Sequence, residues 1–177
     1  MIKELSVKAK SANRKAHVIS TACLIAAAVL FVTRLIVNRF VGIIDLGTIG
    51  CITASVFLYT KYISSNYYYE TMITTDGEPL FLVRRLTGKR STTLCRISFA
   101  EILSIKAESA EEFKKHKTPR GVVKYLYTPT LFPEKVYRIN MRSAYERAEI
   151  VIECSDEFAA LISAWAREAR ANREDDE

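Results

Sequence analysis

Two long apolar runs dominate the first third of the chain. They cover residues 16–37 and 40–62, and each is about 22 residues long. An α-helix of that length spans the hydrocarbon core of a bilayer, which is about 30 Å thick. Only Asn38 and Arg39 separate the runs, which allows a tight turn and brings both outer ends to the same face of the membrane. The pattern therefore predicts a transmembrane helical hairpin over residues 16–62.

After the hairpin, apolar and polar positions alternate in short runs bounded by turn residues, which is the pattern of β-strands. We expect seven strands, at residues 67–75, 80–86, 91–97, 101–107, 122–128, 135–141 and 147–154.

The period changes near the C-terminus, where a helix is expected over residues 157–171 with Asp156 as its N-cap. Four apolar residues fall on one face of this helix: Phe158, Leu161, Ile162 and Trp165. Residues 63–172 are thus predicted to form one α+β domain, and residues 173–177 a charged tail.

The positive charge of the chain surrounds the predicted hairpin. The net charge of +6 comes entirely from residues 1–62, because residues 63–177 carry 18 basic and 18 acidic side chains. A nucleic-acid-binding domain would carry its basic excess on the folded part, so no nucleic-acid partner is expected. Five basic residues lie in a juxtamembrane segment, residues 1–15: Lys3, Lys8, Lys10, Arg14 and Lys15.

These five residues and Lys61 lie at the outer ends of the hairpin, against Arg34 and Arg39 near the turn. The positive-inside rule then predicts a two-pass protein of the cell (plasma) membrane with both termini in the cytoplasm.

Two charged residues lie inside the apolar runs. Arg34 and Asp45 fall at similar depth near the turn of the hairpin. Charges in membrane helices are costly and often paired, so an ion pair across the hairpin is one hypothesis. The other is that each side chain reaches the nearby interface independently. The sequence leaves both open.

Small residues recur at four-residue spacing in the second run: Gly47, Gly50, Cys51 and Ala54. Such residues let two membrane helices approach closely. We expect them to pack the hairpin on itself, with contact between copies of the chain as the alternative.

No pattern of catalytic or cofactor-binding residues emerges. The two histidines, His17 and His116, lie beside the membrane and in a polar loop, with no evident nucleophile. No Gly-rich phosphate loop, no metal-ligand spacing and no C-x-x-C pair is present. We therefore expect no enzymatic activity, no cofactor and no small-molecule substrate.

The order of the predicted elements, seven short strands and then one amphipathic helix, resembles the bacterial pleckstrin-homology-like (PH-like) domain membrane proteins. The resemblance rests on the run ISFAEILSI at residues 97–105 and on TTDGEPLFLVRRLTGKR at residues 74–90. It implies a seven-stranded antiparallel barrel or sandwich with a capping C-terminal helix, preceded by two membrane helices. The first inter-strand loop, residues 75–79, is acidic where phosphoinositide-binding members are basic. Inositide recognition is therefore not implied.

Several basic residues are candidates for contact with anionic lipid head groups, each worth about 1 kcal/mol near the surface. They are Lys8, Lys10, Arg14, Lys15 and Lys61 beside the hairpin, and Arg84, Arg85, Lys89 and Arg90 on one predicted β-hairpin. The alternative for the four residues of the β-hairpin is that they form its ordinary solvent-exposed face and tip.

These features favour a membrane-anchored, non-enzymatic adaptor that binds a protein partner or itself, by a groove or by strand addition at a sheet edge. The alternative is an accessory or regulatory subunit of a larger membrane complex, bound through the hairpin.

Overall fold

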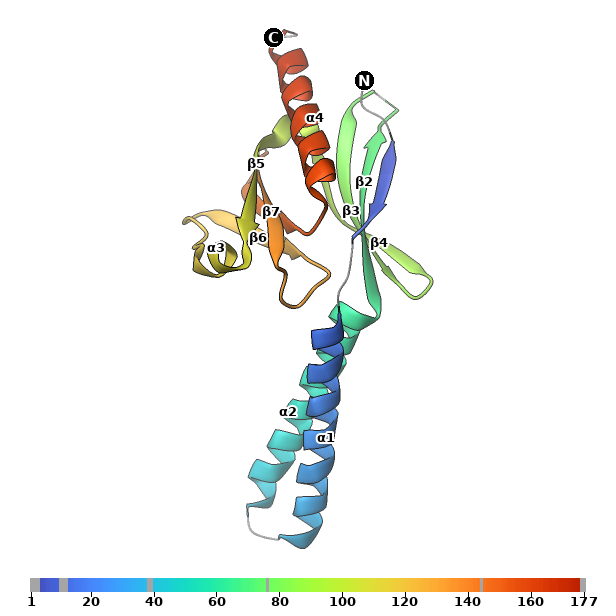
Figure 1. Cartoon of the computed structure of the whole chain (residues 1–177), viewed down its shortest axis with the longest axis vertical. Helices are drawn as coiled ribbons and strands as arrows, with labels where there is room; N and C mark the ends of the chain where they lie inside the picture. The colour runs from blue at the N-terminus through green and yellow to red at the C-terminus, as the bar shows by residue number, and fades with distance from the viewer. Residues whose placement is uncertain (1–3, 10–12, 38–39, 76, 144, 176–177) are drawn as a thin grey trace. The chain divides into compact units, whose positions relative to one another are not determined.

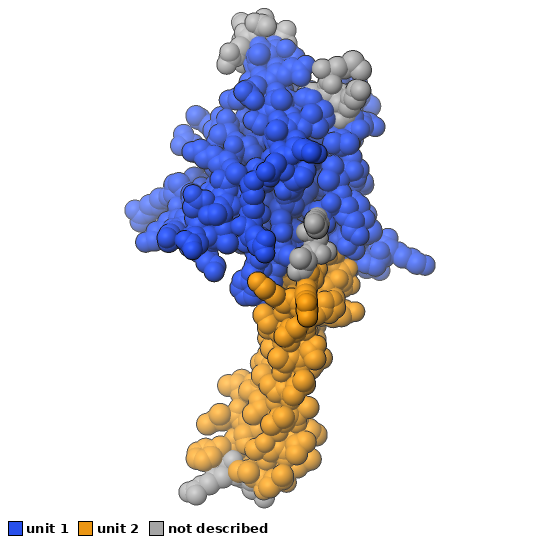
Figure 2. All heavy atoms as spheres, viewed as in Figure 1, with its two compact units in different colours: residues 1–11, 66–177 blue, residues 12–65 orange. Residues whose placement is uncertain are grey.

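The structure, a computed structural model, describes residues 4–9, 13–37, 40–75, 77–143 and 145–175. It divides into a helical unit, residues 12–65, and a β-rich unit, residues 1–11 and 66–177 (Figure 2). Lys3, Lys10, Asn38 and Arg39, which the sequence analysis names, lie outside the described residues.

Two long helices form the helical unit, α1 (Arg14–Ile36) and α2 (Val41–Leu58), and a π-helical turn, η1 (Tyr59–Ile63), extends the second (Figure 1). Both are long and apolar enough to cross a membrane. Only 11% of the apolar window of each helix is buried, whereas a core helix of a soluble protein would be mostly buried. The exposed apolar faces therefore suit a lipid environment.

Small side chains line the seam between α1 and α2. Ala16, Ser20 and Ala27 are the buried residues of α1, and Ser55 is the buried residue of α2. The spacing of four and seven residues places the α1 group on one face of the helix, as in helices that pack with a 3.5-residue period.

Eight strands in two four-stranded sheets form most of the β-rich unit (Figure 1). Sheet A has the order β1-β2-β3-β4 and comprises Leu5–Lys8, Ser65–Ile73, Pro79–Thr87 and Arg90–Ser98. Sheet B has the order β5-β7-β8-β6, with β5 at Ile102–Ser109, β6 at Val122–Tyr127, β7 at Lys135–Arg142 and β8 at Arg147–Ile152.

The expected seven-stranded antiparallel barrel is wrong in three respects. The additional strand, β1, lies in the segment that the sequence analysis assigned to the juxtamembrane region, and Val7 of β1 pairs with Tyr69 of β2. Strands β6 and β8 run parallel. The sheets also do not close into a barrel, because β4 and β6 are unpaired edges of separate sheets within the described residues. The sequence pattern of residues 122–127 does not indicate which strand they pair with, because strand pairing depends on residues far away in the sequence.

One core joins both sheets and the C-terminal helix α4 (Asp156–Asp175). Tyr69 and Phe81 of sheet A, Ile150 of sheet B and Trp165 of α4 belong to this core. Phe99, in the 3-10 turn η2 (Phe99–Glu101) between the sheets, meets Trp165 edge to face at 5.9 Å between ring centroids. Such aromatic pairs add about 0.5–1.5 kcal/mol beyond area burial.

Hydrogen-bonded caps set the starts of two helices. Ser109 and Glu112 form a capping box at the start of α3 (Ala110–Lys115), within the stretch expected to be an irregular polar loop. At α4 the N-cap is Ser155, whose hydroxyl accepts a hydrogen bond from Phe158 N at 3.3 Å, and not Asp156 as expected. The side chain of Asp156 is bonded to Lys135 Nζ instead, at 2.7 Å.

Strand β1 should be required for the stability of sheet A. Val7 packs against the core while the neighbouring Lys8 is exposed. We therefore expect Val7→Asn to destabilise the β-rich unit by about 1–2 kcal/mol, part of the full burial energy of a valine. Hydrogen exchange of the β2 amides should accelerate accordingly.

Lys8→Asn is the matched control, because it places the same side chain one residue further along the strand. Equal effects of the two substitutions would show that β1 does not contact the core.

Candidate functional site

Two serines connect the helices of the hairpin. The hydroxyls of Ser20 and Ser55 are 2.9 Å apart, and Ser55 Oγ also donates to the carbonyl oxygen of Ser20 at 3.1 Å. Both residues are buried. In a bilayer such bonds satisfy groups that have no water nearby, and each contributes about 1 kcal/mol to helix association.

The two charged residues of the apolar helices lie together. Arg34 Nε is 2.8 Å from Asp45 Oδ1, the geometry that the ion-pair hypothesis requires. The two side chains are 43% and 38% exposed, and no other hydrogen bond to them is found among the described residues. The pair therefore supplies the main compensation for two charges in an apolar hairpin.

The predicted packing residues of α2 differ in their surroundings. A Cβ atom on Gly47 would lie 3.3 Å from Leu30 Cδ1, so this glycine permits close approach to α1. A Cβ atom on Gly50 would meet nothing within 4 Å. Cys51 is half-buried and Ala54 is exposed. The hairpin seam thus uses Gly47 and leaves Gly50 and Ala54 on an outer surface.

The candidate lipid-binding residues do not form one patch. Arg84 pairs with Glu70 at 3.0 Å, and Arg85 is adjacent to it in β3, so the two side chains point to opposite faces of the sheet. Lys89 and Arg90 are exposed at the turn between β3 and β4, where Gly88 has a φ of +59°. The β3–β4 tip therefore presents two cations, and the remainder of the predicted cluster is dispersed.

The basic residues beside the hairpin have separate environments. Arg14 and Lys15 are exposed at the start of α1, and Lys8 is exposed in β1. Lys61 lies over the rings of Phe57 and Tyr62, with its Nζ 5.5 and 5.2 Å from their centroids. Amphipathic contacts of this kind are common where a membrane helix ends.

A buried charge cluster occupies the face of sheet B opposite the core. Arg138 of β7 is 2% exposed and forms a bidentate pair with Glu108 of β5, with both N–O distances at 2.6 Å. Its third contact is Glu149 of β8, at 2.5 Å. His116 and Thr118 follow α3 and contact Glu149 at 3.2 and 3.3 Å. The two carboxylates bind the guanidinium from neighbouring strands.

The electrostatics of this cluster favour a structural role. Hydrogen bonding to Arg138 holds the pKa of Glu108 below its usual range. No group of three or more His, Cys, Asp or Glu in the described ranges is arranged to hold a metal ion. The guanidinium bridges the two carboxylates, so it offsets part of their charge inside the sheet and engages both of them within the fold.

A groove of about 360 Å³ lies where the two sheets fail to meet. The edge strands β4 and β6 supply its walls, and the core residues Met141 and Ile150 line it as well. Tyr127 of β6 donates a hydrogen bond to the carbonyl oxygen of Leu94 in β4, at 3.2 Å. The groove is thus the open side of the sandwich, bounded by the edges of β4 and β6, neither of which pairs with a further strand among the described residues.

A β-bulge shapes the β4 wall of the groove. Leu94 has no register partner, because Cys95 pairs with Val83 and Thr93 with Arg84. Bulges bend and twist a strand edge, and they are frequent beside functional sites. The bulge therefore turns the edge of β4 away from a flat strand at the point where Tyr127 reaches it.

The lining of the groove combines apolar side chains with charged ones. Burial raises the pKa of the Cys95 thiol to about 11 and that of Tyr127 to about 12, so both are neutral at physiological pH. Its lining includes the acidic Glu101 and Glu146 and the basic Arg96. The chemistry suits a ligand that offers backbone hydrogen bonds, apolar side chains and positive charge.

The Ser20–Ser55 bond, the Arg138 cluster and the β4–β6 groove are absent from the sequence predictions. For the Ser20–Ser55 bond, the available signal was that each apolar run contains one serine. The alternation of Arg138 with Tyr137 and Ile139 placed Arg138 on the non-core face, but its partners come from β5 and β8. The groove depends on pairing between distant strands, which has no local signal.

The contact between Arg34 and Asp45 yields a charge-reversal prediction. Arg34→Asp and Asp45→Arg should each weaken the hairpin, because each leaves two like charges together at low dielectric. The double variant should recover on the order of 1 kcal/mol of helix association. The measurement is resistance of the reconstituted chain to unfolding in SDS. A double variant as unstable as the combined single variants would contradict the pairing.

Loss of the buried Arg138 guanidinium should strongly destabilise the β-rich unit. Arg138→Met leaves two carboxylates buried without their cation, which costs about 3–5 kcal/mol. Arg84→Met, which breaks an exposed pair, is the control and should cost less than about 1 kcal/mol. Hydrogen exchange of the β7 and β8 amides measures the difference.

The cost of Glu108→Gln should also depend on pH. Since the pKa of Glu108 is lowered by folding, its contribution is complete above the ordinary glutamate value and is lost as the pH falls through the lowered one. The difference in unfolding free energy between wild type and Glu108→Gln should narrow as the solution is acidified. A difference that is constant with pH would exclude this coupling.

Comparison with known proteins provides no family for the chain. No family model matches it, no curated protein is significantly similar to it, and no solved structure has a significantly similar fold. What is established is two apolar helices that could cross a membrane, followed by a sheet-rich α+β unit with a C-terminal helix.

Proposed function

We propose that this chain is a membrane-anchored, non-enzymatic binding module, whose β-rich unit captures an extended basic segment of a protein partner in the β4–β6 groove. The observation that carries the proposal is the groove between two unpaired strand edges. Extended peptides add to such edges through main-chain hydrogen bonds, and pockets for alternate side chains give specificity. Glu101 and Glu146 at the rim favour a cationic partner.

The proposed orientation places the β-rich unit at the cytoplasmic face of the plasma membrane. If α1 and α2 both cross the bilayer, the pairing of β1 with β2 requires that the chain before and after the hairpin be on one side. Arg14, Lys15 and Lys61 at the outer ends of the hairpin then favour the cytoplasmic side by the positive-inside rule.

A PH-like assignment of the β-rich unit is part of the proposal. The chain order of β2 to β8 followed by α4, in two sheets, supports it. Strand β1 and the parallel pairing of β6 with β8 are departures from that arrangement. The adaptor proposal itself rests on the groove, and it holds with or without this assignment.

Site-specific photo-crosslinking in intact membranes tests the binding proposal. A photoreactive phenylalanine analogue at Tyr125, in the groove, should crosslink to another protein. The same analogue at Phe132, an exposed aromatic position outside the groove, should give no such product. Glu146→Lys should reduce the Tyr125 product by about tenfold, since a loss of 1.4 kcal/mol has that effect.

Two results would reject the proposal. One is a Tyr125 product that Glu146→Lys leaves unchanged. The other is crosslinking only from the analogue at Phe31, which is 49% exposed on α1, because that would indicate an accessory subunit bound through its hairpin.

A further inference from the structure

Two arginines lie side by side at the end of sheet B that carries the β7–β8 turn. Arg142 ends β7, Arg147 begins β8, and the register pairs them directly across the two antiparallel strands. Residues paired in this way project from the same face of a sheet, with Cβ atoms about 4.5–5.5 Å apart. Two like charges in that position are destabilising, so the fold gains no stability from having both.

Both side chains project from the face of sheet B opposite the core. Their neighbours along the strands, Met141 and Ala148, are core residues, and side-chain direction alternates along a strand. The side chains of Arg142 and Arg147 are exposed, and neither forms an ion pair or a side-chain hydrogen bond within the described part of the chain. The pair is therefore accessible from solution.

The carboxylate that shares this face is already bound within the fold. Glu149 is 4% exposed and contacts Arg138 at 2.5 Å and His116 Nε2 at 3.2 Å. The acidic residue of the β7–β8 turn, Glu146, lines the β4–β6 groove on the other face of the sheet. The arginine pair thus has no carboxylate in contact with it among the described residues.

The loop before β6 adds cations beside the pair. Val122, the first residue of β6, pairs with Arg147, and Arg120 lies two residues before Val122 in a turn. Thr118 of the same loop bonds to Glu149 at 3.3 Å, which holds the loop against this end of the sheet. We define the basic end of sheet B by its four exposed cations, Lys117, Arg120, Arg142 and Arg147.

An aromatic side chain lies in the turn between the two paired arginines. Tyr145 is 98% exposed, so its ring contributes almost nothing to the packing of the fold. Its backbone is held, because Ser143 Oγ accepts hydrogen bonds from the amides of Tyr145 and Glu146 at 3.3 and 3.2 Å. Tyrosine is enriched at the membrane–water interface, where the ring lies at the level of the lipid head groups.

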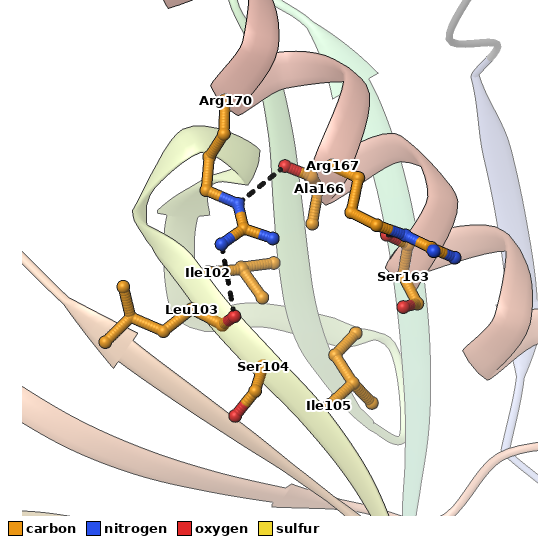
Figure 3. Close-up of a pocket in the computed structure, with 8 residues that line it drawn as sticks. All are labelled: Ile102, Leu103, Ser104, Ile105, Ser163, Ala166, Arg167 and Arg170. Carbon is orange, nitrogen blue, oxygen red and sulfur yellow. Dashed lines mark hydrogen bonds between the residues drawn. The ribbon is translucent and has the colours of Figure 1, made fainter. Parts of the chain in front are cut away.

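Several other arginines of the β-rich unit are held by the fold. Arg84 and Arg138 form ion pairs with glutamates. Arg170 of α4 donates hydrogen bonds to the carbonyl oxygens of Ala166 and Leu103, at 3.2 and 3.3 Å (Figure 3). The guanidinium groups of the basic end have no comparable partner among the described residues, so they remain available to an external anion.

We propose that the basic end of sheet B docks on the head groups of an anionic bilayer. Each Lys or Arg close to such a surface strengthens the attraction about fivefold, and four lie together here. The same chain carries two helices that could cross a membrane, so a bilayer would be within reach. The exposed Tyr145 favours lipid over an acidic protein surface, because its ring and hydroxyl suit the boundary between apolar and wet layers.

This surface and the β4–β6 groove belong to opposite faces of sheet B, and the two proposals stand or fall separately. The groove is tested by protein crosslinking from Tyr125, and the basic end by lipid contact at Tyr145. Loss of the crosslink with lipid contact retained would reject only the peptide-binding proposal.

Paramagnetic relaxation of the full chain in nanodiscs tests the docking. One set of discs contains phosphatidylserine in phosphatidylcholine and the other phosphatidylcholine alone, and both carry the same fraction of lipid with a gadolinium chelate on its head group. The amide NMR signals of Tyr145 and Arg147 should broaden more in the phosphatidylserine discs. High salt should remove the difference, because it screens exposed charges.

Replacing both paired arginines, Arg142→Gln with Arg147→Gln, should weaken the contact about 25-fold, the product of two fivefold steps. This double variant removes a like-charge pair, so its thermal unfolding midpoint should not fall, and a loss of contact is then not a loss of fold. The matched control is Lys89→Gln with Arg90→Gln, which removes two exposed cations from the β3–β4 tip in sheet A. It should leave the broadening at Tyr145 unchanged.

Three results would overturn the lipid proposal. The first is equal broadening in the two kinds of disc. The second is a control variant that reduces the broadening at Tyr145 as much as the arginine double variant does. The third is a shift of the Arg147 Nε–H signal by soluble polyglutamate with no broadening in phosphatidylserine discs, which would assign the basic end to an acidic protein partner.

Discussion

Inside a bilayer, polar groups have no water to bond, and the contacts within the hairpin are those that this constraint would require of two membrane-spanning helices. Helices satisfy their own backbone groups, and several polar side chains find partners within the hairpin. Ser20 bonds to Ser55 at one level of the hairpin and Arg34 to Asp45 at another. The hydroxyls of Thr33 and Thr48 donate to backbone carbonyl oxygens of the preceding helical turn. Around these contacts the hairpin presents apolar side chains outward, as two helices that cross a bilayer would.

The β-rich unit follows a different rule, because its two sheets meet incompletely. Along the side that α4 covers, Phe99 and Trp165 close the core. On the β4–β6 side, the sheets are linked by side-chain hydrogen bonds, from Tyr127 to the carbonyl oxygen of Leu94 and from Tyr69 to the carbonyl oxygen of Tyr127. An incomplete closure leaves main-chain groups without partners, which natural proteins usually cover, bend or use for binding. The bulge at Leu94 bends this edge, and the remaining groove is open to a ligand. The packed core thus lies on the side that α4 covers, and the accessible strand edges lie on the β4–β6 side.

Local pattern predicted most of the elements but few of their partners. Strands β2 to β8 were each predicted within a few residues, because their core-facing residues alternate with polar ones, as in Tyr67, Tyr69 and Thr71. Strand β1 was missed because it is only four residues long and ends in Lys8, within a segment rich in basic residues. The capping-box pattern of Ser109 and Glu112, S-x-x-E, was also present in the sequence but was not used. The parallel pairing of β6 and the contacts of Arg138 depend on residues far away in sequence. The Arg34–Asp45 ion pair could be proposed from the sequence because a short turn determines which residues of the two helices lie at the same depth. A sheet has no such simple rule for its strand partners.

The position of β1 has a consequence for the order of events during synthesis. Its residues leave the ribosome before the hairpin, and their partner strand emerges only after both helices have been made. Sheet A cannot be completed until that point. If only one helix crossed the membrane, β1 and β2 would be separated by the bilayer, and Val7 could not reach Tyr69. If both helices span a membrane, completion of the sheet therefore requires both crossings, and a chain with a single crossing would lack the β1–β2 pairing.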